Sequence, residues 1–242
     1  MIELSIVLPC YQEMENLKIL LPQLIEVIKK MEVITEIIVV DTMKPMDDTK
    51  ALCNSLVNES HVEVCYIPRR KGNMYGDAIR TGITSARGTY ILVMDADGSH
   101  APLDVERLYN EIKKDGYDIV IGSRYVQGGN SHNGLALKCM SYALNITYKI
   151  MFGLKLRDIS NSFRIYISDK LKSLDLECDN FDVVEEILIR LKSKYPHILI
   201  KEIPVYFNKR LFGKSKRDLI KFVFSYIQTI FRLKVIQAES IK

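Results

Sequence analysis

At residues 89–100 the chain reads TYILVMDADGSH, in which a short apolar run ends abruptly at two aspartates. The apolar run, residues 90–94, follows a glycine and is rich in residues that favour strands. A run of this length and composition is typical of a strand buried on both faces of a sheet. In an open parallel sheet, ligands bind just beyond the carboxyl ends of the strands. We therefore expect Asp95 and Asp97 to lie at the mouth of a ligand crevice.

Asp95 and Asp97 have the chemistry of a site for a divalent cation. On a fully extended chain the two side chains would point in opposite directions, but a turn that begins at Ala96 lets both reach one ion. Mg2+ typically binds one or two protein carboxylates and completes its coordination with water and substrate phosphates. The alternative is a polar turn with a helix cap, which is the commoner outcome for so short a pattern taken alone.

The composition is that of an ordinary globular protein. The 242 residues are 48% hydrophobic and 26% charged, which suffices for one sizeable core or two small domains. The net charge of +4 is too small to indicate a nucleic-acid partner. The five cysteines lack the spacing of a zinc site or a disulfide framework, which favours a reduced cytoplasmic chain. We expect no signal peptide, because the chain begins with a strand-like run, ELSIVLP, and no membrane span, because no uninterrupted apolar stretch reaches ~18 residues.

Strand and helix patterns alternate through the first half of the chain. Patterns typical of strands occupy residues 4–8, 36–40, 62–67, 90–94 and 118–121, and helical patterns occupy residues 15–30, 48–57, 74–86 and 102–114. This alternation with short connections predicts an α/β fold with a parallel sheet and right-handed crossovers. Polar residues follow the predicted strands at Tyr11, Glu13, Asp41 and Arg124. Their shared position favours a ligand crevice at one edge of the sheet. Each of these residues taken singly is more typical of a surface loop.

The second half of the chain does not continue the regular alternation of strands and helices. After a glycine-rich loop, the patterns predict helices at residues 135–151 and 180–194, a polar turn entering a strand at 157–166, and a strand at 198–207. Pro204 makes that last strand an edge strand, because proline cannot donate to a sheet ladder. A basic loop, residues 208–217, leads into a terminal helix that reaches residue 236. We expect a catalytic domain over residues 1–215 and an amphipathic basic helix over 216–242.

Three short motifs resemble one enzyme family. The sequences PCYQE at residues 9–13, VVD at 39–41 and DAD at 95–97 are similar to the family 2 glycosyltransferases of GT-A fold. The later segments GSRY at 122–125, DISNSFRIY at 158–166 and RLFGKSK at 210–216 resemble the dolichyl-phosphate mannose synthases and their polyprenyl-phosphate relatives. The resemblance covers residues 1 to about 235, and it implies a mostly parallel central sheet flanked by helices.

The resemblance implies a role for each matching residue. Those that would hold the nucleotide base and ribose are Pro9, Tyr11, Glu13, Val39 and Asp41. Asp95, Ala96 and Asp97 would form the site for the donor diphosphate and a bound Mg2+ or Mn2+. Ser99 occupies a position where some family members have a metal-binding Gln and others have a Ser. The acceptor phosphate would meet Arg124, Ser162 and Arg164, and the basic residues near the donor diphosphate would be Arg210 and Lys216.

One departure from the family pattern concerns the donor. The family usually shows a second acid and a Gly-Ser pair after the aspartate of the second strand, whereas this chain has Asp41-Thr42-Met43-Lys44-Pro45. The selectivity for base or sugar can therefore differ.

The implied chemistry is transfer from a nucleotide sugar. A bound cation neutralises the diphosphate leaving group. Arg210 and Lys216 would add positive charge to the site as their loop closes, with Gly213 as a hinge. The alternative is a solvated basic loop. A phosphate monoester acceptor is already anionic near neutral pH and needs no general base. A sugar hydroxyl needs a general base, and the candidates are Asp158, Glu185 and Glu186. The alternative interpretation is that Asp158 is an ordinary turn residue and that the two glutamates lie on a solvated helix face.

The terminal helix would suit a lipid acceptor. It combines aromatic and aliphatic residues with basic ones, among them Lys221, Phe231, Arg232 and Lys234, a pattern that can lie in a membrane interface. The alternative is a helix that packs on the core or on a partner chain. Family members with membrane helices carry them beyond this region, and we expect none here. The chain would then be peripheral on the cytoplasmic face of a membrane.

The favoured function is the transfer of a sugar to a polyprenyl or dolichyl phosphate, with inversion at the anomeric carbon. The favoured donor is GDP-mannose, which supplies mannose. The alternatives are a transferase that uses a UDP-sugar and a saccharide hydroxyl, a nucleotidyltransferase, and a non-catalytic binding protein. The sequence leaves the oligomeric state open.

Overall fold

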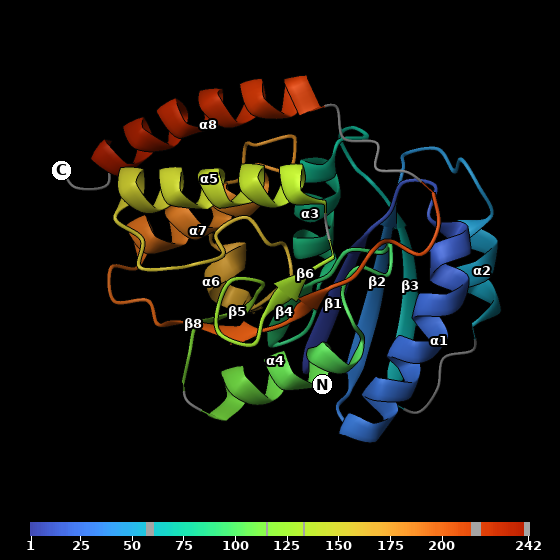
Figure 1. Ribbon diagram of the computed structural model, residues 1–242. Helices are drawn as coiled ribbons and strands as arrows, with labels where there is room; N and C mark the ends of the chain where they lie inside the picture. Colours follow the sequence, from blue (N-terminus) through green and yellow to red (C-terminus); the bar gives the residue numbers. More distant parts are fainter. Residues whose placement is uncertain (57–60, 115, 133, 214–218, 240–242) are drawn as a thin grey trace.

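A seven-stranded sheet forms the centre of the molecule, with helices on both faces (Figure 1). The computed structural model describes residues 1–56, 61–114, 116–132, 134–213 and 219–239. The strand order is β3-β2-β1-β4-β7-β5-β8, and a separate two-stranded ladder joins β6 to β9. The strands are β1 (Leu4–Pro9), β2 (Thr35–Asp41), β3 (Val62–Pro68), β4 (Tyr90–Val93), β5 (Ile119–Ser123), β6 (Asn130–Ser131), β7 (Arg164–Ile167), β8 (Ile200–Pro204) and β9 (Tyr206–Phe207).

The helices divide between the two faces because alternate strand residues point to opposite sides. Val7 of β1 belongs to one buried cluster, and its neighbours Ile6 and Leu8 belong to the other. One face is covered by α1 (Met14–Met31), α2 (Thr49–Ser55) and α4 (Leu103–Lys114). The other face is covered by α3 (Tyr75–Ser85), α5 (Leu135–Phe152), α6 (Ser168–Lys172), α7 (Val183–Lys194) and α8 (Leu219–Glu239). The inner strands β1, β2 and β5 are thus buried on both sides, as their apolar runs predict, whereas most residues of the edge strands β3 and β8 are half-buried.

The parallel sheet expected from the alternating pattern is confirmed for all strands but one. β7 runs antiparallel between β4 and β5, with Arg164 opposite both Val93 and Ile121. The sequence predicts a strand in this region but gives no direction for it. Since β7 starts where its two parallel neighbours end, the loop before it, residues 157–163, lies at the carboxyl edge of the sheet.

The last part of the sheet also differs in detail from the prediction. β8 is an edge strand, as Pro204 predicts, but it ends at that proline, and the chain continues as the separate strand β9. The short helix α6 has no counterpart among the predicted elements.

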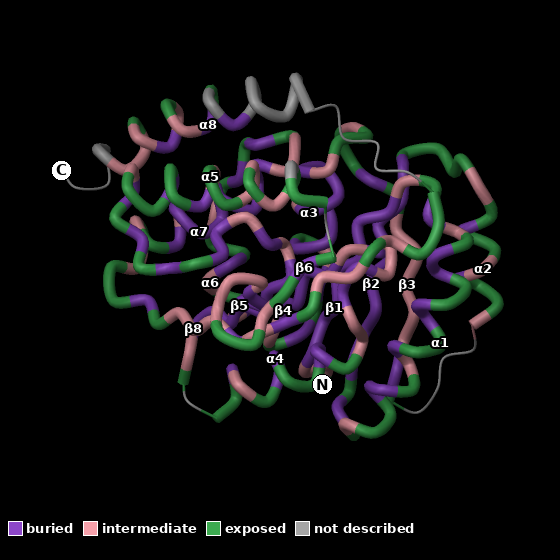
Figure 2. Tube along the Cα trace, in the orientation of Figure 1, coloured by how far each residue is buried: buried purple, intermediate pink, exposed green. Residues whose placement is uncertain are grey.

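The terminal helix α8 packs on the rest of the molecule along part of its surface. Tyr226 and Leu233 belong to the same buried cluster as the sheet, whereas Phe231 and Val235 are exposed (Figure 2). Tyr148 of α5 meets Tyr226 edge to face at 6.2 Å between ring centroids, so α5 and α8 are neighbours (Figure 1). Across the described part of the chain, no helix has the length and apolar character needed to cross a membrane.

Candidate functional site

Polar residues that follow β1, β2 and β4 meet at one edge of the sheet. The amide of Cys10, just after β1, donates to the Val40 carbonyl of β2 at 2.8 Å. The amide of Met94, just after β4, donates to the Val7 carbonyl of β1 at 3.1 Å. The residues that come next along each strand therefore share this edge, as the position of the strand ends predicts.

The turn after β4 holds its two aspartates in different surroundings. Asp95 Oδ1 accepts hydrogen bonds from Tyr75 Oη at 3.1 Å and from Ser162 Oγ at 3.0 Å. Asp97 Oδ1 accepts the amide of Ser99 at 2.9 Å. Gly98 has a φ of +79°, which a residue with a side chain adopts only at a cost. The turn thus directs Asp95 towards α3 and the 157–163 loop.

Arg210 lies against the other aspartate. Its Nη2 lies 3.1 Å from Asp97 Oδ2 and 3.1 Å from Glu13 Oε1. The backbone supports this placement, because the Leu211 amide donates to the Asp97 carbonyl at 3.0 Å. The structure therefore brings together Glu13, Asp97 and Arg210, which were predicted separately. Lys216, predicted beside them, lies outside the described residues.

The Asp95–Asp97 turn fits a hard cation. Burial alone would raise the pKa of Asp97, but hydrogen bonds from Ser99 and the charge of Arg210 lower it below its usual value. The carboxylate is therefore ionised at neutral pH. Two carboxylates and the buried Ser99 hydroxyl offer the oxygen donors that Mg2+ prefers. A guanidinium already lies against Asp97, which shows that this position favours positive charge.

The end of β2 carries Asp41 in a network that the sequence reveals only in part. Asp41 accepts the Thr42 amide at 2.7 Å and Tyr66 Oη at 3.1 Å, and burial raises its pKa. Arg69, which was not predicted as a site residue, donates from its guanidinium to the Cys10 carbonyl and to the loop before α3. Its position after β3, at the same edge, is the signal that could have identified it.

Three of the residues assigned to the donor are held in the core. Pro9 and Ala96 are buried, and the Val39 side chain is fully buried inside β2 among the residues that face α1. Val39 therefore does not present its side chain at the sheet edge, whereas Tyr11 is partly exposed there.

Arg124, after β5, is fixed by a bidentate ion pair with Asp158. Its Nε lies 2.8 Å from Asp158 Oδ2 and its Nη2 lies 2.7 Å from Asp158 Oδ1. Nη2 also donates to Ser160 Oγ at 2.9 Å and to Ser141 Oγ of α5 at 3.2 Å. The Arg124 side chain is only 8% exposed, and its guanidinium lies 5.3 Å from the Tyr125 ring centroid and 5.6 Å from that of Phe207. Among the described residues, no hydrogen bond uses Nη1.

Arg164 and Ser162, predicted with Arg124, are placed differently from one another. Ser162 reaches Asp95, so it lies at the edge of the sheet. Arg164 is 0% exposed and donates to the carbonyls of Val184 and Ile159 inside the core. The structure therefore does not bring the Arg164 side chain to the place where a phosphate would bind beside Arg124.

The three carboxylates considered as general bases are all engaged or enclosed. Asp158 is fully buried and paired with Arg124. Glu186 is fully buried and accepts the amides of Glu177 and Cys178 and the Arg190 guanidinium. Glu185 is fully buried, and burial raises its pKa to about 8. The alternative, that the two glutamates lie on a solvated helix face, is therefore wrong, because both side chains are 0% exposed.

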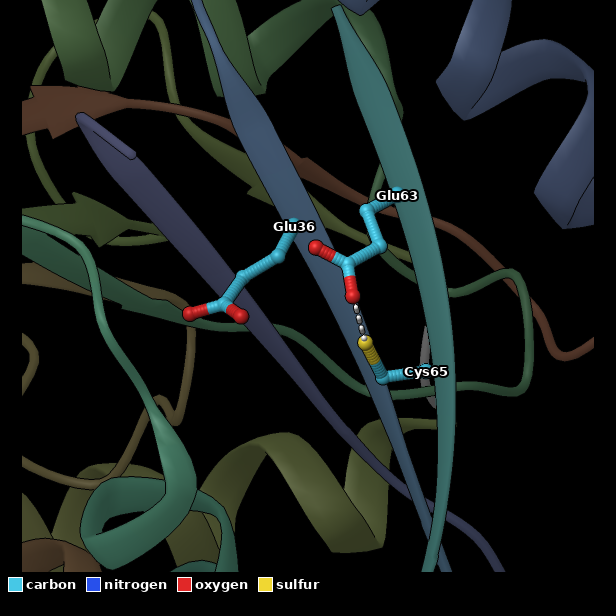
Figure 3. A group of neighbouring side chains, drawn as sticks. All are labelled: Glu36, Glu63 and Cys65. Atoms are coloured by element: carbon cyan, nitrogen blue, oxygen red, sulfur yellow. Dashed lines mark hydrogen bonds between the residues drawn. The ribbon is translucent and has the colours of Figure 1, made fainter. Parts of the chain in front are cut away.

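A second group of acidic and thiol side chains, Glu36, Glu63 and Cys65, lies near the opposite ends of β2 and β3 (Figure 3). Cys65 Sγ donates to Glu63 Oε1 at 3.2 Å, and burial raises the pKa of this thiol to about 12. Arg87 pairs with Glu36 at 2.7 Å and with Glu63 at 2.6 Å. The carboxylates are already compensated by this arginine, so we interpret the group as a structural ion-pair network.

Comparisons with known sequences agree with the motifs. The model of glycosyl transferase family 2 matches residues 5–175. A dolichol-phosphate mannosyltransferase of Pyrococcus furiosus is 32% identical over 241 residues, which are 98% of this chain and 65% of the relative. An undecaprenyl-phosphate mannosyltransferase of Micrococcus luteus is 31% identical over 217 residues, which are 87% of this chain and 85% of the relative. This chain thus spans less than two thirds of the length of the Pyrococcus protein.

Comparisons with solved structures agree with the fold. Glucosyl-3-phosphoglycerate synthase of Mycobacterium tuberculosis, in complex with Mn2+, UDP-glucose and phosphoglyceric acid, superposes with a TM-score of 0.68 at 19% identity, covering 96% of this chain and 79% of that one. The same enzyme with Mg2+ and UDP gives a TM-score of 0.65 at 20% identity, covering 94% and 76%. At this identity the likeness concerns the fold, and it confirms the expected GT-A architecture. The matched motifs, the family model and the fold together show that the chain belongs to the family 2 glycosyltransferases.

Proposed function

We propose that this protein transfers a sugar from a nucleotide donor to a polyprenyl phosphate, with inversion and with the help of a divalent cation. One observation carries the proposal: the 157–163 loop connects two charged centres. Its Ser162 bonds to Asp95 of the anionic centre, and its Asp158 and Ser160 hold Arg124 of the cationic one. A cation and donor diphosphate suit the first centre, and an acceptor phosphate suits the second.

The state of the carboxylates supports a phosphate acceptor over a hydroxyl one. A hydroxyl must lose a proton to a positioned base during transfer. Each carboxylate considered for that task, Asp158, Glu185 or Glu186, is buried, and two of them are ion-paired. A phosphate monoester has its second pKa near ~6 and needs no such base. The names of the two curated relatives point to the same acceptor class and to mannose, so GDP-mannose is the donor that we propose.

The mechanism that follows is a single displacement. Asp95, Asp97 and Ser99 would hold Mg2+ or Mn2+, which when bound would neutralise the leaving diphosphate. Arg210 would release Asp97 and turn its charge to the same diphosphate, because a carboxylate bound to a cation no longer needs it. Arg124 would orient the acceptor phosphate, with Asp158 fixing the plane of its guanidinium. Attack from the face opposite the leaving group inverts the anomeric carbon.

A membrane contact fits the surface formed by α5 and α8. The side chains of Leu135, Ile150 and Phe231 are 78%, 74% and 69% exposed, on helices that lie next to each other (Figures 1 and 2). The α5 segment contains two lysines and no acidic residue. Ser141 of α5 bonds to Arg124, so this helix joins the exposed apolar surface to the acceptor centre. We therefore propose that α5 and α8 together lie at the cytoplasmic face of the membrane.

The function can be tested with the purified protein and two pairs of substrates. GDP-mannose or UDP-glucose is offered with polyprenyl phosphate or with an oligosaccharide, in the presence of Mg2+ or Mn2+. We expect GDP release that depends on polyprenyl phosphate, together with a mannosyl phospholipid. A product on the oligosaccharide would favour the hydroxyl acceptor instead, and release of pyrophosphate would indicate a nucleotidyltransferase.

A further inference from the structure

Arg164 is the largest side chain that is completely buried in the described part of the molecule. It is the first residue of β7, and its backbone lies between Val93 of β4 and Ile121 of β5. An arginine side chain stays charged in a protein interior. Burying a charge has a large free-energy cost unless hydrogen bonds or an opposite charge offset it. The contacts of Arg164 therefore show what this residue stabilises.

The guanidinium of Arg164 joins a helix to a loop. Nη1 donates to the Val184 carbonyl in the first turn of α7 at 2.9 Å, and Nη2 donates to the Ile159 carbonyl. The carboxyl group of Glu185 is also fully buried, and the Arg164 charge lowers its pKa, although burial raises that pKa more strongly. Arg164 also interacts with the buried Tyr166 of β7. Because the Arg164 side chain is 0% exposed, these interactions lie in the core.

The loop that Arg164 holds carries the residues that fix Arg124. Ile159 is flanked by Asp158 and Ser160, both of which bond to the Arg124 guanidinium. The same stretch is held from α5, because Asn145 Oδ1 accepts the amides of Ile159 and Ser160, each at 3.0 Å. A displacement of the Ile159 carbonyl would therefore move the two groups that orient Arg124.

We propose that Arg164 is a positioning residue for the acceptor half of the site: it fixes Ile159, and through Asp158 and Ser160 it sets the orientation of Arg124. The inference rests on the proposed function, since it assigns the acceptor phosphate to Arg124. It replaces direct contact between Arg164 and the phosphate with support from within the core.

The test compares substitutions at Arg164 on β7 with a matched arginine substitution on α7. Arg164→Met removes the charge. Arg164→Lys keeps the charge, but its single ammonium group replaces the planar guanidinium that donates to two carbonyls. For both we expect the KM for polyprenyl phosphate to rise on the order of tenfold while the KM for GDP-mannose changes by less than about twofold. Arg190→Met, which breaks the buried pair with Glu186, should lower thermal stability and leave both KM values near wild type.

A double-mutant cycle with Arg124→Ala separates positioning from direct contact. If Arg164 acts through Arg124, Arg164→Lys adds almost nothing once Arg124 is absent. Additive losses, or equal losses for donor and acceptor, would overturn the inference. Should the Arg164 variants fail to fold, Asn145→Ala releases the same loop without altering the buried charge. It should give the same acceptor-selective loss, and an unchanged acceptor KM would contradict the inference. If Arg124→Ala alone leaves the acceptor KM unchanged, the proposed function itself fails.

Discussion

Asp97, in the proposed donor site, accepts the Ser99 amide and pairs with the Arg210 guanidinium. Asp97→Ala should lower the transfer rate ~100-fold or more, since it removes a cation ligand and leaves the core untouched. Initial rates over a range of Mg2+ and Mn2+ concentrations test this, and circular dichroism confirms the fold. Asp175→Asn, on an exposed loop residue, serves as the control. Wild-type turnover of Asp97→Ala without divalent cation would remove the metal role from this turn.

Glu185 should make the stability of the protein depend on pH. Burial raises its pKa from 4.5 to about 8, so the folded state holds a proton that the unfolded state releases between these values. The corresponding stabilisation is complete below about pH 4.5 and is lost as the pH rises through about 8. Glu185→Gln should flatten this part of the curve, as measured by urea unfolding at several pH values. Identical pH dependence in wild type and variant would show that Glu185 does not titrate in this range.

Single residues show what local sequence can and cannot predict. Asp95, Asp97 and Arg124 could be found because they directly follow strands, and the end of a strand is visible as the end of an apolar run. Arg164 could not be placed correctly, because the direction of its side chain depends on the register of β7 with strands distant in sequence. A charged residue is also expected at the surface from its type alone.

At the level of elements, the start of α3 is fitted closely against the segment before α7. A Cβ on Gly76 would lie 2.0 Å from the Cys178 carbonyl oxygen, which is backbone and cannot rotate away. Gly76→Ala should therefore lower the free energy of unfolding by roughly 1–3 kcal/mol. It should also reduce turnover, because the next residue back, Tyr75, bonds to Asp95.

The matched control for this change is Gly134→Ala. Gly134 precedes α5, and a Cβ there would meet nothing within 4 Å. Its denaturation midpoint should stay close to that of the wild type. Equal midpoints for the Gly76 and Gly134 variants would mean that the segment around Cys178 can move aside.

The order and type of most elements could be predicted from the sequence, because the alternating apolar patterns are strong. Four features could not be predicted: the direction of β7, the short helix α6, the two-residue strand β6 and the break between β8 and β9. The direction of a strand follows from how the chain returns to the sheet, which no local pattern records. A helix of five residues has too few turns to show a periodic apolar face.

At the scale of the whole molecule, the exposed apolar surface of α5 and α8 should control binding to membranes. Ile150→Asp and Phe231→Asp should each weaken co-sedimentation with anionic vesicles, because each replaces an exposed apolar side chain with an acidic one. Binding by the wild type should decrease in high salt without vanishing, since each basic residue contributes only about 1 kcal/mol and apolar burial is insensitive to salt. Leu103→Asp, on α4 across the sheet, is the control. Equal binding by all three variants would move the contact to another surface.

The insertion of β7 between β4 and β5 has a consequence for how the protein is made. A ribosome delivers β4 and β5 well before β7, so a nascent chain that ends ahead of residue 164 lacks the strand that fills the space between them. Unpaired strand edges promote association with other chains, and pairings between distant segments form slowly. The loop that joins the two charged centres also reaches its place only when β7 pairs. Protection from aggregation and the capacity to bind both substrates should therefore be acquired in one late step of biosynthesis.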